Sequence, residues 1–336
     1  MAKEHNTPLT SGEIGILWNN YQVDSMSLCV ENVHAAHEQD AQVHALIVVT
    51  IAFLEKSIAE MRRIFEKEEL PIPVGFTDSD VNFAAPALYS SIFRLQYIKS
   101  KVNIRMMANG LALAGVTRAD VRNFYRDVSI AVLDLDDKVT KLLLERGLYI
   151  RAPYIAVDKR REFVQGQDFM GSFFSAGKRN LLALEIGVLN TNIQNNIIGK
   201  FLLTGFAQTA ESAVVRQYMW RGVEIANKHI DILSAILRKE DIPVPTPWDS
   251  GVTSSTTAPY SDKLMLSHVA FLNQGGIAAC GINTAAASRK DLQATYLRLA
   301  AETGQYAADG AKLLIDNKWM EEAPKVVGHR ELQSLH

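Results

Sequence analysis

Four side chains in the second half of the sequence combine residue types and spacing that suit metal chemistry. Carboxylates and imidazoles that point inward from separate helices are the usual ligands of metal sites in helical bundles. One such residue falls in each of four stretches with helical periodicity. The sequence therefore predicts a site for iron, manganese or zinc, or a small-molecule pocket, built from Glu185, His229, His268 and Glu302.

Two features count against this site. Dinuclear iron bundles carry Glu-x-x-His on two helices, and neither His229 nor His268 has a glutamate three residues before it. Glu302 falls in the middle of its predicted helix and Glu185 near the start of another, which argues against a shared level in the bundle. The alternative is the commoner role of such residues, in which histidines form hydrogen bonds in the core and acids pair with bases.

A second candidate site lies in the first half. Glu31 and His34 have the Glu-x-x-His spacing and share one face of a predicted helix, and His37 follows them. A metal-binding corner formed by these three residues is one interpretation. The motif falls at a helix end, however, and occurs in one half only. A solvated corner between two helices is the alternative, because short motifs often match by chance.

The elements that position these residues are duplicated. Residues of about 9–153 reappear, shifted by 171–172 positions, as residues of about 181–324. For example, Glu13-Ile-Gly15 returns as Glu185-Ile-Gly187. A co-linear repeat of this length indicates two copies of one domain. We predict one domain over residues 1–153, a linker over 154–180, a second domain over 181–324 and a polar tail over 325–336.

The duplication allows the two halves to be compared with each other. Features that both halves keep are expected to serve the fold, and features of one half are candidates for function. Of the four candidate ligands in the second repeat, only Glu185 has the same residue type, Glu13, at the equivalent position. The other three equivalents are Ser57, Tyr97 and Ala131. We therefore hypothesise that repeat two holds the pocket and that repeat one is a scaffold.

Hydrophobic periodicity predicts four helices in each repeat, and strand-like alternation is nearly absent. After each second helix, a segment of roughly fifteen to twenty residues could run the length of the bundle or form an irregular cap at one end. The tyrosine that follows it in both repeats, Tyr89 or Tyr260, is expected to anchor it by hydrogen bonding. In the linker, Phe169, Phe173 and Phe174 are expected to pack between the bundles. The predicted helices cover residues of about 10–35, 38–69, 90–113, 118–146, 181–206, 209–240, 261–286 and 289–317.

The composition narrows the partners. The chain has 336 residues, is 48% hydrophobic and carries a net charge of −2, with no long basic run, which argues against nucleic acid. The polar start is not a signal peptide, and the longest apolar run, residues 45–54, is too short to cross a bilayer. We therefore predict a cytoplasmic protein without a membrane partner. Cys29 and Cys280 occupy non-equivalent positions and are typical of small core residues.

Five segments of the sequence carry motifs of one known family: Leu9 to Trp18, Leu70 to Val81, Gly147 to Tyr154, Asp241 to Asp249 and Ser261 to Met265. Together they resemble the tandem domain-of-unknown-function family numbered three-two-three-one of spore-forming bacilli. That family is distantly similar to spore coat protein F and is grouped with ferritin-like four-helix bundles. The resemblance implies an all-α fold of two tandem ferritin-like four-helix bundles and a link to spores, and it brings no catalytic residues.

Three functions remain open at this point. The leading one is a non-catalytic structural or interaction protein that acts in spores or sporulating cells and forms homo-oligomers or binds spore-coat-type partners. The second is a ferritin-like metal-binding or oxidase-type protein that uses repeat two. The third is a carrier or sensor that holds an apolar ligand in one bundle.

Overall fold

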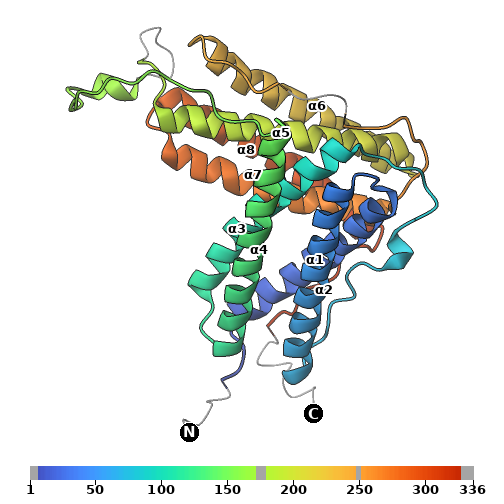
Figure 1. Ribbon diagram of the computed structural model, residues 1–336. Helices are drawn as coiled ribbons and strands as arrows, with labels where there is room; N and C mark the ends of the chain where they lie inside the picture. The colour runs from blue at the N-terminus through green and yellow to red at the C-terminus, as the bar shows by residue number, and fades with distance from the viewer. Residues whose placement is uncertain (1–6, 172–178, 247–250, 327–336) are drawn as a thin grey trace.

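The computed structural model describes residues 7–171, 179–246 and 251–326. Within them the chain forms α-helices and no strands, which confirms the predicted all-α class, and each helix end lies within four residues of its predicted position. Isolated backbone bridges and two short 3-10 turns are the other regular features of this part of the chain. The helices are α1 (Ser11–His37), α2 (Ala41–Lys67), α3 (Ser91–Gly115), α4 (Ala119–Glu145), α5 (Ala183–Thr209), α6 (Ala213–Arg238), α7 (Asp262–Ala286) and α8 (Lys290–Asp316) (Figure 1).

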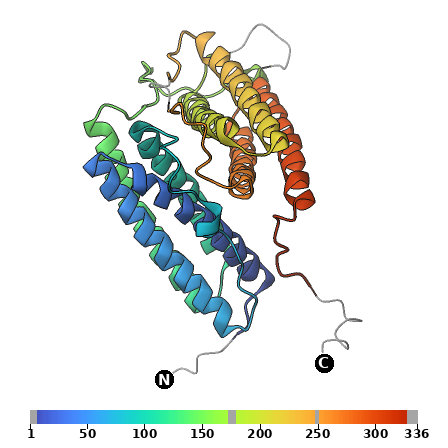
Figure 2. The ribbon, with the colours of Figure 1, turned by 90° about the vertical axis from the view of Figure 1, so that its right-hand side faces the viewer.

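The helices form two groups of four that lie side by side, with those of the second half at a steep angle to those of the first (Figures 1 and 2). In each group consecutive helices pack as antiparallel hairpins, α1 with α2 and α3 with α4 in the first half, and α5 with α6 and α7 with α8 in the second. One apolar core lies inside each half, and a third is shared by both halves. The molecule is therefore built around the contact between its repeats as much as around each repeat.

The segment between the second and third helix of each repeat runs the length of its bundle. In repeat one, α2 ends beside the start of α4, where Glu68 and Arg118 form an ion pair of 2.6 Å. α3 begins beside the end of α1, where Arg94 and Glu38 form an ion pair of 3.0 Å. Residues 68–90 therefore have to cross from one end of the bundle to the other, and we call them crossover one. In repeat two, α6 ends beside the start of α8, where Glu240 and Arg289 form an ion pair of 2.6 Å, and α7 begins beside the end of α5, where Asp262 accepts from the Ser212 N–H at 2.8 Å. We call the described residues between α6 and α7, 239–246 and 251–261, crossover two.

The two crossovers pair with each other about an approximate two-fold axis. The backbone bridges of this contact join Val81 to Tyr260 and Tyr89 to Val252. Val81 is equivalent to Val252 and Tyr89 to Tyr260, each with a shift of 171 positions. The two bridges are therefore copies of one contact. The Ser90 N–H donates to the Gly251 carbonyl at 2.9 Å, and the Ser261 N–H donates to the Asp80 carbonyl at 2.8 Å in the same way. The contact is isologous, as in a symmetric homodimer, although one chain makes both sides.

Side chains close to this axis are fully buried. Tyr97 and His268 are equivalents, and the Tyr97 hydroxyl lies 3.1 Å from Nε2 of His268. The ring of Tyr97 also packs edge-on against His34, and that of His268 packs edge-on against Phe206, the equivalent of His34. The predicted anchoring by hydrogen bonding holds for Tyr89, whose hydroxyl donates to the Leu202 carbonyl at 2.7 Å, but not for Tyr260, whose hydroxyl has no hydrogen-bond partner in the described structure. The repeats cannot separate without exposing this shared core.

Phe169 does not pack between the bundles: it lies under the Arg179 guanidinium, 4.3 Å from ring centroid to Cζ, at the outer end of repeat two. Phe173 and Phe174 lie outside the described residues. After α8 the chain returns to repeat one, where the Glu321 carboxylate accepts hydrogen bonds from the Val74 and Gly75 N–H groups at 3.0 and 2.8 Å.

We predict that Gly205→Ala destabilises the protein by about 1–3 kcal/mol, because a Cβ at Gly205 would lie 2.5 Å from the Tyr89 hydroxyl in a packed interface. Gly199→Ala in the same helix is the matched control, since a Cβ there has no neighbour within 4 Å. The control should leave stability unchanged or raise it by up to about 1 kcal/mol. Urea unfolding followed by circular dichroism measures both, and equal effects would contradict the assigned contact.

Candidate functional site

The four residues of the predicted metal site lie in three separate places. His229 and Glu302 come together between α6 and α8, with 3.1 Å between Nε2 and Oε2. The Glu302 carboxylate also accepts from Lys228 Nζ at 2.7 Å. Burial lowers the pKa of His229, and Glu302 offsets only part of this effect. His229 therefore shares its partner carboxylate with a lysine.

A groove of about 380 Å³ runs between α6 and α8 beside this pair. One end is bounded by Lys228 and Glu302, and the other by Arg221 and Asp309, which form an ion pair of 2.6 Å. Tyr306 lines the groove, with its ring centroid 5.1 Å from Arg221 Cζ. Two ion pairs thus join α6 to α8 across the groove, Arg221 with Asp309 and Lys228 with Glu302.

His268 and Glu185 do not reach this groove. His268 lies on the two-fold axis between the repeats, where burial holds its pKa well below the usual range. Glu185 lies at the start of α5 and accepts from the N–H groups of Leu182 at 2.9 Å and Ser288 at 3.1 Å. It also forms an ion pair of 2.8 Å with Arg179. In the described part of the chain, no three His, Cys, Asp or Glu side chains are arranged to hold a metal, so the predicted four-residue centre is not assembled there.

Glu185 has a structural role that explains why both repeats keep it. Its equivalent Glu13 accepts from the N–H groups of Thr10, Thr117 and Arg118, each at 2.8 Å, and so caps the starts of α1 and α4 together. Burial alone would raise the pKa of Glu13, but these hydrogen bonds outweigh it and lower the pKa to about 2. Two helix N-termini that share one carboxylate are fixed relative to each other.

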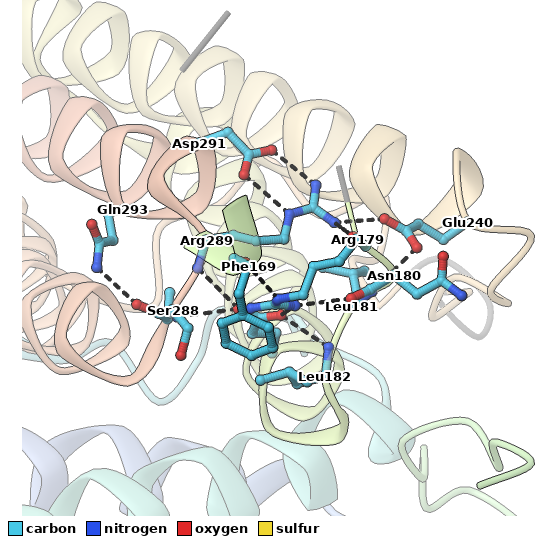
Figure 3. Close-up of polar contacts among 12 residues, drawn as sticks. Phe169, Arg179, Asn180, Leu181, Leu182, Glu240, Ser288, Arg289, Asp291 and Gln293 are labelled. Carbon is cyan, nitrogen blue, oxygen red and sulfur yellow. Dashed lines mark hydrogen bonds and ion pairs between the residues drawn. The ribbon is translucent and has the colours of Figure 1, made fainter. Parts of the chain in front are cut away.

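An arginine beside each capping glutamate completes a polar cluster that the sequence analysis missed. In repeat two, Arg289 forms ion pairs with Glu240 at 2.6 Å and with Asp291 at 2.9 Å (Figure 3). In repeat one, Arg118 forms ion pairs with the equivalent residues Glu68 and Asp120 at 2.6 and 2.7 Å. The signal was present in the sequence, because Thr117-Arg-Ala-Asp120 and Ser288-Arg-Lys-Asp291 occupy the same place. The cluster ties the end of one helix to the start of another.

The interior of repeat one is more polar than a passive scaffold requires. Asp24 of α1 forms a buried ion pair with Arg105 of α3 and accepts from the Ser57 hydroxyl at 2.7 Å. The equivalents in repeat two are Asn196, Gly276 and His229, so the pair has no counterpart there. Sequence reasoning overlooked Asp24 and Arg105 because they are 81 residues apart and belong to no short motif.

The second candidate site is buried, and the interpretation as a solvated corner is wrong. Glu31 and His34 are 2% and 3% exposed, and Oε2 of Glu31 lies 3.3 Å from Nδ1 of His34. Nε2 of His34 has no hydrogen-bond partner in the described structure. His37 lies one turn further along α1, where burial and then the Arg94 charge lower its pKa. The Glu31–His34 pair therefore lies in the shared core. In the described part of the chain, no third His, Cys, Asp or Glu side chain completes a metal site with it.

These features define the class of the protein, an all-α chain of two duplicated helical bundles joined through paired crossovers. The chain belongs to the family described as protein of unknown function (DUF3231), whose model matches residues 1–160 and again residues 170–332. The duplication predicted from the sequence is thereby confirmed.

Comparison with other proteins adds little beyond the family. No curated protein matches the chain. Among solved structures, the chain is similar to a protein of Bacillus halodurans described as a "putative spore coat protein", with 17% sequence identity and a TM-score of 0.40. The match covers 46% of this chain and 99% of that chain, so that protein corresponds in length to about one repeat.

We predict that Glu13→Gln lowers stability near neutral pH and that the difference from the unchanged protein closes as the pH falls. The pKa of Glu13 is lowered from 4.5 to about 2 on folding, so its contribution is present above pH 4.5 and is lost as the pH falls toward 2. The difference should reach up to about 3 kcal/mol at pH 7. Urea unfolding at a series of pH values measures it. The control is Glu66→Gln at an exposed position of α2, and the same pH profile in both variants would contradict the capping role.

Proposed function

We propose that this protein is a non-catalytic structural or interaction protein that acts by docking another protein surface. The observation that carries the proposal is the outer face of α2. Ala45, Val48, Val49 and Ala52 share one side of this helix and are exposed, and Val48 is 47% exposed. We call these four residues the α2 outer face. Contiguous exposed apolar surface on a folded domain is typical of interaction sites.

The whole of α2 is unusually apolar. Among the described helices it is the one long and apolar enough, by length and composition, to cross a membrane. Its most apolar window has a mean hydropathy of 1.5, and only 28% of that window is buried. In the fold, however, α2 is one of the four helices of the first bundle and contacts α1 and α4. Its exposed apolar side chains thus add to a surface that the bundle holds in a fixed shape.

The path of the chain supports assignment of each bundle to the ferritin-like class. Two antiparallel hairpins joined by one crossover along the bundle is the connection pattern of ferritin-like folds. We further propose that the protein acts in spores or sporulating cells, which the resemblance carried by residues 9–18 and 70–81 favours. A protein of this kind needs a rigid body and a docking face, and it needs no reactive centre.

One observation favours a second candidate function, metal binding in repeat two. His229 and Glu302 lie side by side at the groove between α6 and α8. Plasma mass spectrometry of protein purified without a tag or chelator, alongside His229→Ala, decides between the two functions. A stoichiometric ion that is lost in the variant supports the metal site. Absence of metal in both samples after loading with iron or manganese removes it.

For the leading proposal, we predict that a photoreactive group on the α2 outer face cross-links selectively to a bound protein. A photoreactive phenylalanine analogue at position 48, expressed in sporulating cells of the native host, should give discrete protein adducts after irradiation. The same residue at position 214 is the matched control, because Val214 is 57% exposed on α6, outside the α2 outer face. Absence of adducts at both positions, or identical adduct patterns from both, would contradict the proposal.

A further inference from the structure

The α2 outer face is symmetric about its own midpoint. Ala45 and Ala52 lie at its two ends, Val48 and Val49 lie at its centre, and the sequence Ala-x-x-Val-Val-x-x-Ala reads the same in residue types in both directions. All four side chains are exposed on the same side of the helix. Residues 45–52 contain no charged side chain. A helix of the same sequence, laid across this face in the opposite direction, would match it residue for residue.

We propose that the α2 outer face binds a second copy of this chain, with the two α2 helices antiparallel and a two-fold axis between Val48 and Val49. This inference rests on the proposed function and names its partner. The valines of the two copies would meet at the axis, and each Ala45 would face Ala52 of the second copy. The small alanines at both ends let two helices approach closely, and knob-in-hole packing of this kind is ordinary helix–helix contact.

The residues that flank the face support the same arrangement. A two-fold axis between residues 48 and 49 places Glu55 opposite Gln42 of the second copy, and Lys56 opposite Ala41. Glu55 and Lys56 are both exposed. Lys56 would then lie close to the start of the other α2, where the Asp40 carboxylate caps the helix through the Gln42 and Val43 N–H groups. A lysine near this carboxylate is favourable, although Asp40 also forms an ion pair of 2.8 Å with Arg146 of its own chain.

The face of α6 that is equivalent to the α2 outer face explains why the assembly would stop at two copies. The equivalent face of α6 consists of Gln217, Trp220, Arg221 and Glu224. This face is charged and lacks the symmetry, and its Arg221 is already engaged with Asp309. Of these two equivalent faces only the one on α2 is self-complementary, and an isologous contact through it closes as a dimer.

The size of the face sets the expected affinity. The symmetric stretch from Ala41 to Lys56 spans about 22 Å of helix at 1.5 Å per residue. A single helix–helix contact of that length buries less than the roughly 1,200–2,000 Å² of a stable complex. We therefore expect a dimer that dissociates on dilution through the micromolar range.

Sedimentation over a concentration series tests the dimer on the full chain. The unchanged protein should show a reversible monomer–dimer equilibrium, and Val49→Arg, which introduces the residue that repeat two carries, should weaken association at least tenfold. Val214→Arg is the matched control and should associate as the unchanged protein does. A protein that stays monomeric up to millimolar concentration, or equal effects of the two arginine variants, would overturn the proposal.

Cysteine cross-linking tests the direction of packing. In an antiparallel dimer, Val48→Cys next to the axis should form a disulfide with its own copy. Ala45→Cys should not cross-link to itself but should do so when mixed with Ala52→Cys. Cys29 and Cys280 are buried, which keeps the background low. Efficient self-cross-linking of Ala45→Cys would overturn the antiparallel arrangement.

The failure of this inference can be told apart from the failure of the proposed function. Photo-adducts at position 48 that join two copies of this chain support both. Adducts to a different protein from a chain that sediments as a monomer keep the docking function and overturn the self-association. Co-sedimentation with phosphatidylglycerol vesicles that is lost in Val49→Arg, without a dimer, would instead identify a lipid surface and overturn both.

Discussion

The antiparallel pairing of the two crossovers is the contact on which the rest of the structure depends. The described parts of the two crossovers pair with each other through their backbones, so that the Ser90 and Ser261 N–H groups find carbonyl partners in the opposite crossover. The pairing also fixes the two-fold axis and thereby decides which side chains meet in the shared core. With the repeats held in this way, α2 remains on the outside of the molecule, and its outer face stays free.

Two buried ion pairs of repeat one have uncharged residues at both equivalent positions of repeat two. Glu38 and Arg94 form a buried ion pair in repeat one, and their equivalents in repeat two are Ala210 and Met265. Asp24 and Arg105 likewise form a buried ion pair, and their equivalents in repeat two are Asn196 and Gly276. Removal of one member of a buried pair leaves an uncompensated charge and is strongly destabilising, whereas exchange of both for uncharged residues is tolerated.

The sequence predicted the helices and the duplication well because both depend on local periodicity and on self-similarity. It predicted the candidate site poorly because the decisive contacts are long-range. The sequence predicts Glu185 as a ligand, although its equivalent Glu13 is also a glutamate and features kept in both halves are expected to serve the fold. Tyr97 and His268 are 171 residues apart, which is the shift between the repeats, and equivalent residues meet only where a two-fold axis passes between them. The position of His268 depends on that axis, and the pattern of residues within one repeat does not reveal where the axis lies.

Amide hydrogen exchange at the paired crossovers tests the central claim most directly. The Ser90 and Ser261 N–H groups lie outside the helical hydrogen-bond network, and each donates to a carbonyl of the opposite crossover. If the pairing holds the repeats together as one unit, both amides should exchange as slowly as the core of α3 and α7, through global unfolding. Exchange of these amides at the rate of an open loop, while the helices remain protected, would show that the repeats are independent domains and would contradict the account.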